Sequence, residues 1–301
     1  TSEDCSFNNL FLTQNNFKIS QIFYNSDFIM LEGKKAYDKL MKYPCAVAIV
    51  EVADFSKSGS LKETITILDS DKFSIINCMW FVKDNSINAE KCYLQRNQEV
   101  VSYFRSSSVT NSEGDKVVVD YSKSELDLIQ ILVPKIAKLF FYKIEQDLVY
   151  EDKEFTTTGA NFIAKFKNRL VRAYLFLMVA RTTSEVTLKI SFYMTLLESL
   201  FTSNNNEVQH QLSERSSLFI GGEKHEKKEI FELVKDAYTL RSNLMHGNFI
   251  KKTDAEVKRI SKNIDEVIRK IFNKILAGES SVFLLSDSDG DKKSLKNILG
   301  I

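Results

Sequence analysis

Residues that break regular structure are scarce in this chain. Its 301 residues include two prolines and ten glycines, while apolar residues make up 44% and charged residues 27%. This composition excludes collagen-like and low-complexity chains and favours a globular protein with long helices and strands. The length is sufficient for two modest domains, each with a buried core.

Cysteines are few and widely spaced. Cys5, Cys45, Cys78 and Cys92 all lie in the first third of the chain, and no two of them form a C-x-x-C pair. Buried free thiols in a reducing compartment are therefore favoured over disulfides or a structural zinc site. We expect no metal ion and no cofactor.

Long hydrophobic runs and a strong net charge are also lacking. No apolar run reaches transmembrane length, and the first residues, TSEDCSFNN, contain no basic or hydrophobic signal region, so we expect a cytoplasmic protein that does not bind membranes. The net charge is +1, but residues 155–278 carry 20 Lys and Arg against 13 Asp and Glu. An excess of this size is compatible both with a solvated surface and with one that attracts a polyanion.

The first half of the chain predicts strands. Several segments are rich in β-branched residues or alternate between apolar and polar residues, and polar turns separate them. They are residues 45–55, two strands within 63–82, and further candidates at 97–105 and 116–121. We therefore predict an α+β protein whose N-terminal half is a mixed α/β domain with an antiparallel sheet.

The second half predicts an all-α helical bundle. Apolar residues recur at helical spacing in five segments that are joined by short loops. The expected helices span residues 160–180, 184–201, 207–220, 227–245 and 253–276. Thr253 is the predicted N-cap of the last helix, and glycines follow several helix ends.

The domain boundaries follow from this change of period. A helix is expected to begin at Ser124 as its N-cap, and Pro134 should kink it or divide it in two. The pattern breaks after this helix, so the predicted parts are residues 1–150, 155–278 and a C-terminal tail, 279–301. The tail segment LLSDSDGDKKS does not have the register of a calcium-binding loop and is interpreted as a polar turn.

The segment AYTLRSNLMHG (237–247) carries the candidate chemistry. It holds one of the three histidines, five residues after an arginine, at the end of a predicted helix. An imidazole can move a proton and a guanidinium can hold a phosphate oxygen, so Arg241 and His246 suit phosphodiester chemistry. Five residues rotate an ideal helix by about 140°, so the two side chains do not share one face. The competing interpretation is a surface arginine followed by a histidine that caps the helix.

At these residues the sequence resembles the HEPN family, and more closely its Apea-like branch. Ribonucleases of that family carry R-x4-6-H at the end of a bundle helix, with a polar residue directly after the arginine. The branch pattern LY-x-x-RS-x-x-x-HG is matched at Tyr238, Arg241, Ser242, His246 and Gly247. Upstream, LLESLF (196–201) and LSERSSLFIG (212–221) resemble two further helices of the branch, the second with serines in place of alanine-like residues. The resemblance covers residues 155–278.

The resemblance implies a metal-independent endoribonuclease. In such enzymes the RNA 2′-hydroxyl attacks its own phosphate and leaves a 2′,3′-cyclic phosphate. Family members act as homodimers in which two R-x4-6-H motifs face each other across a cleft. Many are toxins or antiphage abortive-infection effectors that cut tRNA or other RNA. The implied partners are therefore RNA, a second copy of the chain, and a phage-derived trigger or an antitoxin.

Specific residues acquire roles by the same resemblance. His246 would be the general acid and base, and Arg241 would bind the scissile phosphate. Ser242 or Asn243 would orient them.

Three further positions match the branch. Glu198 and Arg215 would support the site, with a buried ion pair inside the bundle as the competing interpretation. Tyr238 would either stack on a base or face the core.

The role of residues 1–150 follows from what they lack. They contain no catalytic motif, and we hypothesise that they sense a trigger or restrain the nuclease. The alternative function for the chain is a non-catalytic HEPN-like module that binds RNA or a protein. A third is a helical oligomerisation domain next to a ligand-binding sheet.

Overall fold

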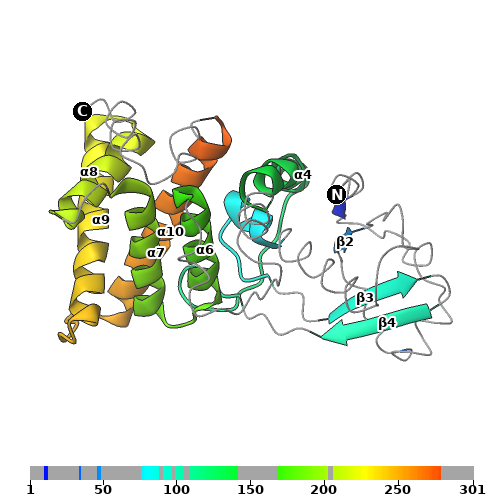
Figure 1. The fold of residues 1–301 in the computed structure, drawn as a ribbon. Helices are drawn as coiled ribbons and strands as arrows, with labels where there is room; N and C mark the ends of the chain where they lie inside the picture. Colours follow the sequence, from blue (N-terminus) through cyan, green and yellow to red (C-terminus); the bar gives the residue numbers. More distant parts are fainter. Residues whose placement is uncertain are drawn as a thin grey trace, which may run out of the picture. The chain divides into compact units, whose positions relative to one another are not determined.

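The computed structural model describes residues 10–12, 34, 46–48, 76–87, 91–96, 99–104, 109–141, 168–202 and 206–278. The chain divides into two compact units, and each unit is built from three separate segments of the sequence. The helical unit comprises Asn77–Ile87, Ser108–Val119 and Lys135–Ile301, and the second unit comprises Thr1–Ile76, Asn88–Ser107 and Asp120–Pro134 (Figure 1).

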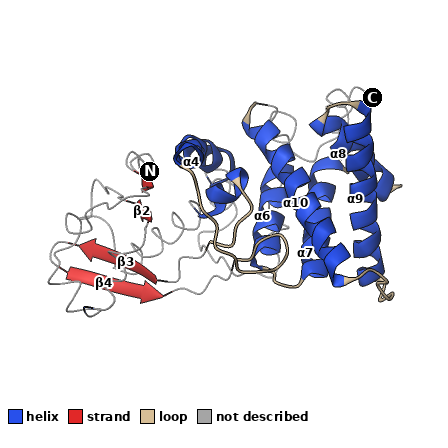
Figure 2. Cartoon of the chain, turned by 180° about the vertical axis from the view of Figure 1, so that it is seen from behind, coloured by secondary structure: helices blue, strands red, loops and turns tan. Residues whose placement is uncertain are grey.

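From residue 137 onward, the described helices of the helical unit are η2 (Ala137–Phe141, a π-helix), α6 (Arg169–Thr182), α7 (Val186–Phe201), α8 (Val208–Ile220), α9 (Lys224–Met245) and α10 (Asp254–Leu276). The expected helix 160–180 is described only from residue 168 and is helical from Arg169. The expected helices 184–201, 207–220, 227–245 and 253–276 are confirmed to within three residues at each end. Helices α8 and α9 lie side by side, next to α7 and α10 (Figures 1 and 2).

Helix α10 shows why local sequence was sufficient for this part. The Thr253 hydroxyl accepts a bond from the Glu256 N–H at 3.3 Å, and the Glu256 carboxylate accepts one from the Thr253 N–H at 2.8 Å. This capping box confirms Thr253 as the N-cap. The predicted apolar stripe is buried throughout: Val257, Ile260, Ile264, Val267, Ile271 and Ile275.

Residues 76–82 are helical and not a strand, which corrects the prediction for 63–82 where the structure describes it. This short helix supplies Trp80 and Phe81, both fully buried, to the core of the helical unit. Their rings contact Phe272 of α10 at centroid distances of 6.3 and 5.7 Å. Phe140 of η2 completes the aromatic cluster by stacking on Tyr174 of α6 at 4.3 Å.

Long-range hydrogen bonds explain why this segment is helical. Its last carbonyl groups need partners, because no further helical turn follows them. Arg269 Nε donates to the Trp80 carbonyl at 2.8 Å, and Asn273 Nδ2 donates to the Phe81 carbonyl at 3.0 Å. An apolar run of this length is compatible with a strand or a buried helix, and partners on α10 decide between them.

Among the residues that the structure describes, the second unit shows no single antiparallel sheet of the predicted kind. Its described strands form two separate antiparallel pairs: β1 (Leu10–Leu12) with β2 (Ala46–Ala48), and β3 (Lys91–Arg96) with β4 (Glu99–Phe104). Leu10 pairs with Ala48 in the first, and Lys91 with Phe104 in the second. The structure that can be described is predominantly helical, so the prediction of an N-terminal antiparallel sheet is wrong.

The candidate strand 116–121 shows the physical reason for part of this error. This segment joins no strand ladder among the described residues. The Val117 N–H donates to the Ser86 hydroxyl at 2.7 Å, and that hydroxyl donates to the Val117 carbonyl at 2.9 Å. One side chain therefore satisfies both backbone groups that a neighbouring strand would have paired, so β-propensity alone did not produce a sheet.

Helix α4 (Lys123–Ile136) begins two residues earlier than predicted. Ser122, and not Ser124, caps it: the Glu125 N–H donates to the Ser122 hydroxyl at 3.3 Å, and Glu125 accepts from the Ser122 N–H at 2.8 Å. Pro134 lies inside the helix, near its end. Residues 142–167 and 279–301 lie outside the described residues, so the division into 1–150, 155–278 and 279–301 stays a prediction.

Candidate active site

The end of α9 places His246 at the surface of the helical unit. The helix ends at Met245, and the His246 N–H donates to the Ser242 carbonyl at 3.0 Å. Gly247 adopts a φ of +70°, which an L-residue rarely takes, and the Asn248 N–H returns to the Asn243 carbonyl at 2.8 Å. These bonds close the last turn, and the His246 side chain is exposed.

Arg241 lies one turn before this end and is held from two sides. Its Nη2 forms an ion pair with Glu198 Oε1 of α7 at 3.5 Å, and its Cζ lies 5.5 Å from the centre of the Tyr238 ring. The side chain is 27% exposed. Its Nε is buried without a hydrogen-bond partner. The guanidinium is therefore oriented by α7, and an approaching anion can reach only the exposed part of the side chain.

Glu198 is the acidic partner that fixes this arginine. Burial raises the pKa of Glu198, and the positive charge of Arg241 opposes that rise. The carboxylate is 22% exposed, so the pair lies at the boundary between core and solvent. A half-buried ion pair of this kind orients a side chain more than it stabilises the fold.

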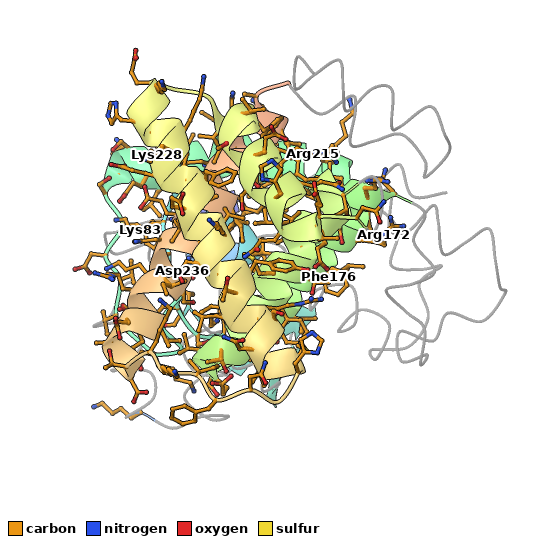
Figure 3. All side chains as sticks on the ribbon, turned by 90° about the vertical axis from the view of Figure 1, so that its left-hand side faces the viewer. Lys83, Arg172, Phe176, Arg215, Lys228 and Asp236 are labelled. Atoms are coloured by element: carbon orange, nitrogen blue, oxygen red, sulfur yellow. The ribbon has the colours of Figure 1, made fainter. Side chains whose placement is uncertain are left out.

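The remaining sequence-predicted residues lie on α8 and α9. Ser242 and Asn243 are half-buried, and both contribute their backbone carbonyls to the helix end. Tyr238 is half-buried against Arg241, neither fully in the core nor free in solvent. Arg215 donates from Nη1 to the Phe201 carbonyl at the end of α7, and burial lowers the pKa of its guanidinium. Figure 3 shows the side of the unit formed by α8 and α9, with Arg215 labelled.

Arg241 and His246 share a helix end and do not contact each other directly. The ion-pair and ring partners of Arg241 are Glu198 and Tyr238, and the His246 ring is not among them. This agrees with the rotation of about 140° expected over five helical residues. Both side chains still reach solvent.

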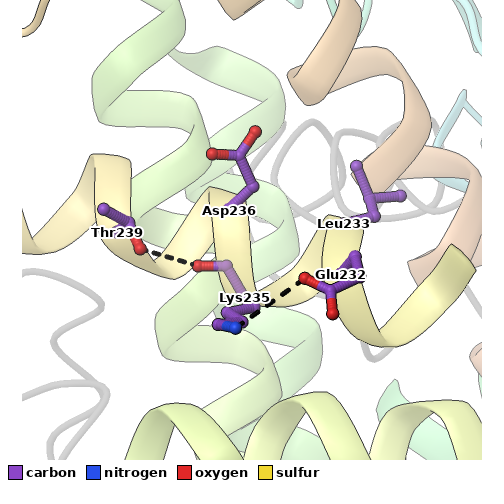
Figure 4. Close-up of a pocket in the computed structure, with 5 residues that line it drawn as sticks. All are labelled: Glu232, Leu233, Lys235, Asp236 and Thr239. Carbon is purple, nitrogen blue, oxygen red and sulfur yellow. Dashed lines mark hydrogen bonds and ion pairs between the residues drawn. The ribbon is translucent and has the colours of Figure 1, made fainter. Parts of the chain in front are cut away.

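A surface pocket of about 460 Å³ lies on α9 before Arg241 and includes neither Arg241 nor His246. It is lined by Glu232, Leu233, Lys235, Asp236 and Thr239 (Figure 4). Its polar groups are already paired, because Lys235 contacts Glu232 at 3.8 Å and Thr239 donates to the Lys235 carbonyl at 2.9 Å. We assign no ligand to this pocket.

A buried charged cluster in the helical unit was missed by the sequence analysis. Lys189 of α7 is fully buried and donates to the Ala180 carbonyl at 2.6 Å and to the Thr110 hydroxyl at 3.1 Å. Burial lowers the pKa of Lys189 to about 8. In the sequence of α7, VTLKISFYMTLLESLF, only Lys189 and Glu198 are charged. The sequence signal that could have identified Lys189 is therefore an isolated charge in a helix that is otherwise uncharged except for Glu198.

Asp265 of α10 forms a second part of this cluster. It accepts hydrogen bonds from Trp80 Nε1 at 2.9 Å and the Tyr193 hydroxyl at 2.8 Å, and it pairs with Arg269. Burial raises the pKa of the Asp265 carboxyl. The cluster ties the segment around Trp80 to α7 and α10, and we interpret it as structural.

Two general properties of the described residues bear on the setting of the site. None of the helices in the described ranges combines the length and apolar character needed to cross a bilayer. Within the same ranges, no three His, Cys, Asp or Glu side chains lie together as metal ligands do.

Comparisons with family models, characterised proteins and solved structures gave no significant match to this chain. The chemical interpretation therefore depends on the residues and the geometry at the end of α9.

Proposed function

We propose that this chain is a metal-independent endoribonuclease of the HEPN type. The observation that supports it best is the setting of Arg241: a carboxylate and an aromatic ring hold its partly exposed guanidinium in the last turns of the helix that ends at the exposed His246. A guanidinium that is held in place and an accessible imidazole, both at one helix end, are the groups needed to bind a phosphodiester and to move a proton.

In this proposal the reaction is an internal transesterification. The RNA 2′-oxygen forms a bond to phosphorus while the bond from phosphorus to the 5′-oxygen breaks, which yields a 2′,3′-cyclic phosphate and a 5′-hydroxyl. His246 takes the proton of the 2′-hydroxyl or delivers one to the leaving 5′-oxygen. Arg241 stabilises the negative charge on the non-bridging oxygens.

Supporting residues would act through Arg241 and His246. Glu198 is a positioning residue, since its carboxylate sets the direction of the Arg241 guanidinium. Ser242 and Asn243 hold the helix end whose geometry aims the imidazole. Arg215 stabilises the end of α7 that carries Glu198, because it binds the Phe201 carbonyl three residues later.

The biological setting belongs to the same proposal. The enzyme would act in the cytoplasm as a homodimer through the helical unit, so that a phosphate held by one chain is served by residues of the other. It would be a toxin or an antiphage abortive-infection effector that cuts tRNA or another RNA. A phage-derived trigger or an antitoxin would control it.

A non-catalytic module that binds RNA or a protein is the alternative function. The observation that favours it is the ion pair itself, because Glu198 already neutralises part of the charge that Arg241 would offer to a phosphate. In this alternative the pair would be a structural contact between α7 and α9.

One experiment separates the two functions. Purified protein is incubated with total RNA in the presence of a chelator, and the new 3′ ends are mapped for cyclic phosphates. Cleavage that is lost in His246→Ala and kept in His225→Ala, an exposed histidine at the start of α9, supports the enzyme. Equal RNA binding by wild type and His246→Ala, with no cleavage by either, supports the non-catalytic module.

A further inference from the structure

The loop that follows α9 exposes an aromatic side chain beside the candidate site. Phe249 is 84% exposed, and no other phenylalanine is exposed among the described side chains. Met245, on the other side of His246, is 56% exposed. Two exposed apolar residues therefore lie on either side of His246 in the sequence and do not pack into the core. Single exposed apolar residues are common on protein surfaces, so these two bear on function only through their position beside His246 and the charges near them.

The same stretch contains more cations than carboxylates, with Arg241 paired to Glu198 of α7. Residues 241–252, RSNLMHGNFIKK, contain three Lys and Arg residues and no carboxylate. Lys252 is held by Asp236 at 3.0 Å, while Lys251 is exposed. A protein ligand would match the apolar side chains, but a polyanion with flat apolar rings matches both the charge and the aromatic group. Single-stranded nucleic acid has this combination, since its phosphates bind cations and its unpaired bases stack on aromatic rings.

The backbone keeps Phe249 close to His246. The turn is closed by the bonds from the Gly247 N–H to the Leu244 carbonyl and from the Asn248 N–H to the Asn243 carbonyl. The Cα atoms of His246 and Phe249 are three residues apart and so lie within about 11 Å of each other. A base next to a phosphate held at His246 is therefore within reach of the Phe249 ring.

We propose that residues 246–252 form a base-binding loop that selects unpaired RNA. Phe249 stacks on the base next to the scissile phosphate, and Lys251 contacts a neighbouring phosphate. This inference rests on the proposed function for the choice of RNA as ligand, and it adds that the substrate is single-stranded at the site of cleavage. A base paired in a helix cannot offer its face to Phe249.

Binding is measured with the full-length His246→Ala protein, which cannot destroy the RNA by the proposed chemistry. The probe is an unstructured RNA oligonucleotide, compared with the same strand in a perfect duplex. Phe249→Ala should weaken binding of the single strand about tenfold or more, whereas Phe249→Trp should retain it. Leu218→Ala, an exposed apolar residue on α8, is the matched control and should bind as the parent does.

Salt dependence tests the lysine. Lys251→Ala should reduce the slope of the logarithm of the binding constant against the logarithm of salt concentration by about 0.7, the value for one phosphate contact with a single strand. Lys262→Ala, an exposed lysine on α10, should leave the slope unchanged.

The possible outcomes separate this inference from the proposed function. Cleavage that depends on His246, with single-strand binding unaffected by Phe249→Ala, overturns the base-binding loop and leaves the nuclease intact. Binding that depends on Phe249, without any cleavage by wild type, overturns the nuclease and supports the loop. Equal affinity for the duplex and the single strand contradicts the selection of unpaired bases. Conversion of a dimer to a monomer by Phe249→Ala, measured by light scattering, shows that a second copy covers this residue and overturns the inference.

Discussion

Lys189 provides a quantitative test of the packing in the helical unit. Its ammonium group is fully buried and has two oxygen acceptors, the Ala180 carbonyl and the Thr110 hydroxyl. These do not replace the hydration that the charge loses, so burial lowers the pKa of Lys189 to about 8. In the unfolded chain a lysine titrates near 10.4.

The sign of the pH effect follows from these two values. Between pH 8 and about 10.4 the unfolded chain binds more protons at this residue than the folded chain does, so the free energy of unfolding rises with pH in that window. Linkage gives a gain of about 1.3 kcal/mol from pH 7 to pH 9 and about 3 kcal/mol over the whole window. Burial also raises the pKa of Cys78 and Tyr174, which lowers stability at higher pH.

The Lys189→Met variant isolates the lysine, because it keeps the length of the side chain and shares all other titrating groups with wild type. The difference in unfolding free energy between the two proteins should move by about 1.3 kcal/mol in favour of wild type from pH 7 to pH 9. Urea unfolding followed by the fluorescence of Trp80, the single tryptophan and a buried residue of this unit, measures it.

Lys262→Met replaces an exposed lysine on α10 and is the control, for which the difference should not change with pH. If the difference in unfolding free energy between wild type and Lys189→Met also does not change with pH, the ammonium group is either hydrated or stabilised by nearby negative charge in the folded state. Burial would then not lower the pKa of Lys189, because no other titrating group differs between the two proteins.

Three further outcomes are expected. Glu198→Gln should lower kcat for RNA cleavage by about tenfold to hundredfold, with a smaller change in KM, because the carboxylate that orients the Arg241 guanidinium is lost. An unchanged kcat would exclude a positioning role for Glu198. Gly114→Ala should lower the free energy of unfolding by about 1–3 kcal/mol in urea, because φ at this position is +81° and a Cβ would overlap a backbone carbonyl oxygen. Gly247→Ala should lower it by less, because φ is +70° there but the space for a Cβ is open. Equal losses in the two variants would contradict the overlap at Gly114. A mixture of Arg241→Ala and His246→Ala chains, each inactive alone, should regain cleavage if two copies share a site, and inactive heterodimers identified by native mass spectrometry would count against sharing.

The helices after residue 168 were predictable because local signals there agree with one another. In α10 the capping residues, the apolar stripe and the glycine after the helix all indicate the same element. The position of His246 at a helix end was predictable for the same reason, since Gly247 follows it directly. Consistent local preferences of this kind leave tertiary packing little to override.

The error in the first half arose where local preference and packing disagree. Residues 78–82, CMWFV, are a continuous apolar run that suits a strand. They nevertheless belong to a helix whose carbonyls are bonded by Arg269 and Asn273, at sequence separations of 189 and 192. The extended segment at Val117 is paired by the hydroxyl of Ser86 and not by a strand. The partners Arg269, Asn273 and Ser86 cannot be identified from local sequence spacing, because each lies far along the chain from the backbone group it bonds.

The sequence by itself determined the helices of the second half, the capped end of α9 and the presence of Arg241 and His246 there, because these depend on residues within a turn or two of each other. Only the tertiary structure decided that Glu198 orients Arg241, that Phe249 stays exposed, and that the segment around Trp80 belongs to the helical core. These properties depend on which distant side chains exclude water and supply hydrogen-bond partners. Burial and pairing of this kind arise from the packed fold and have no local signature.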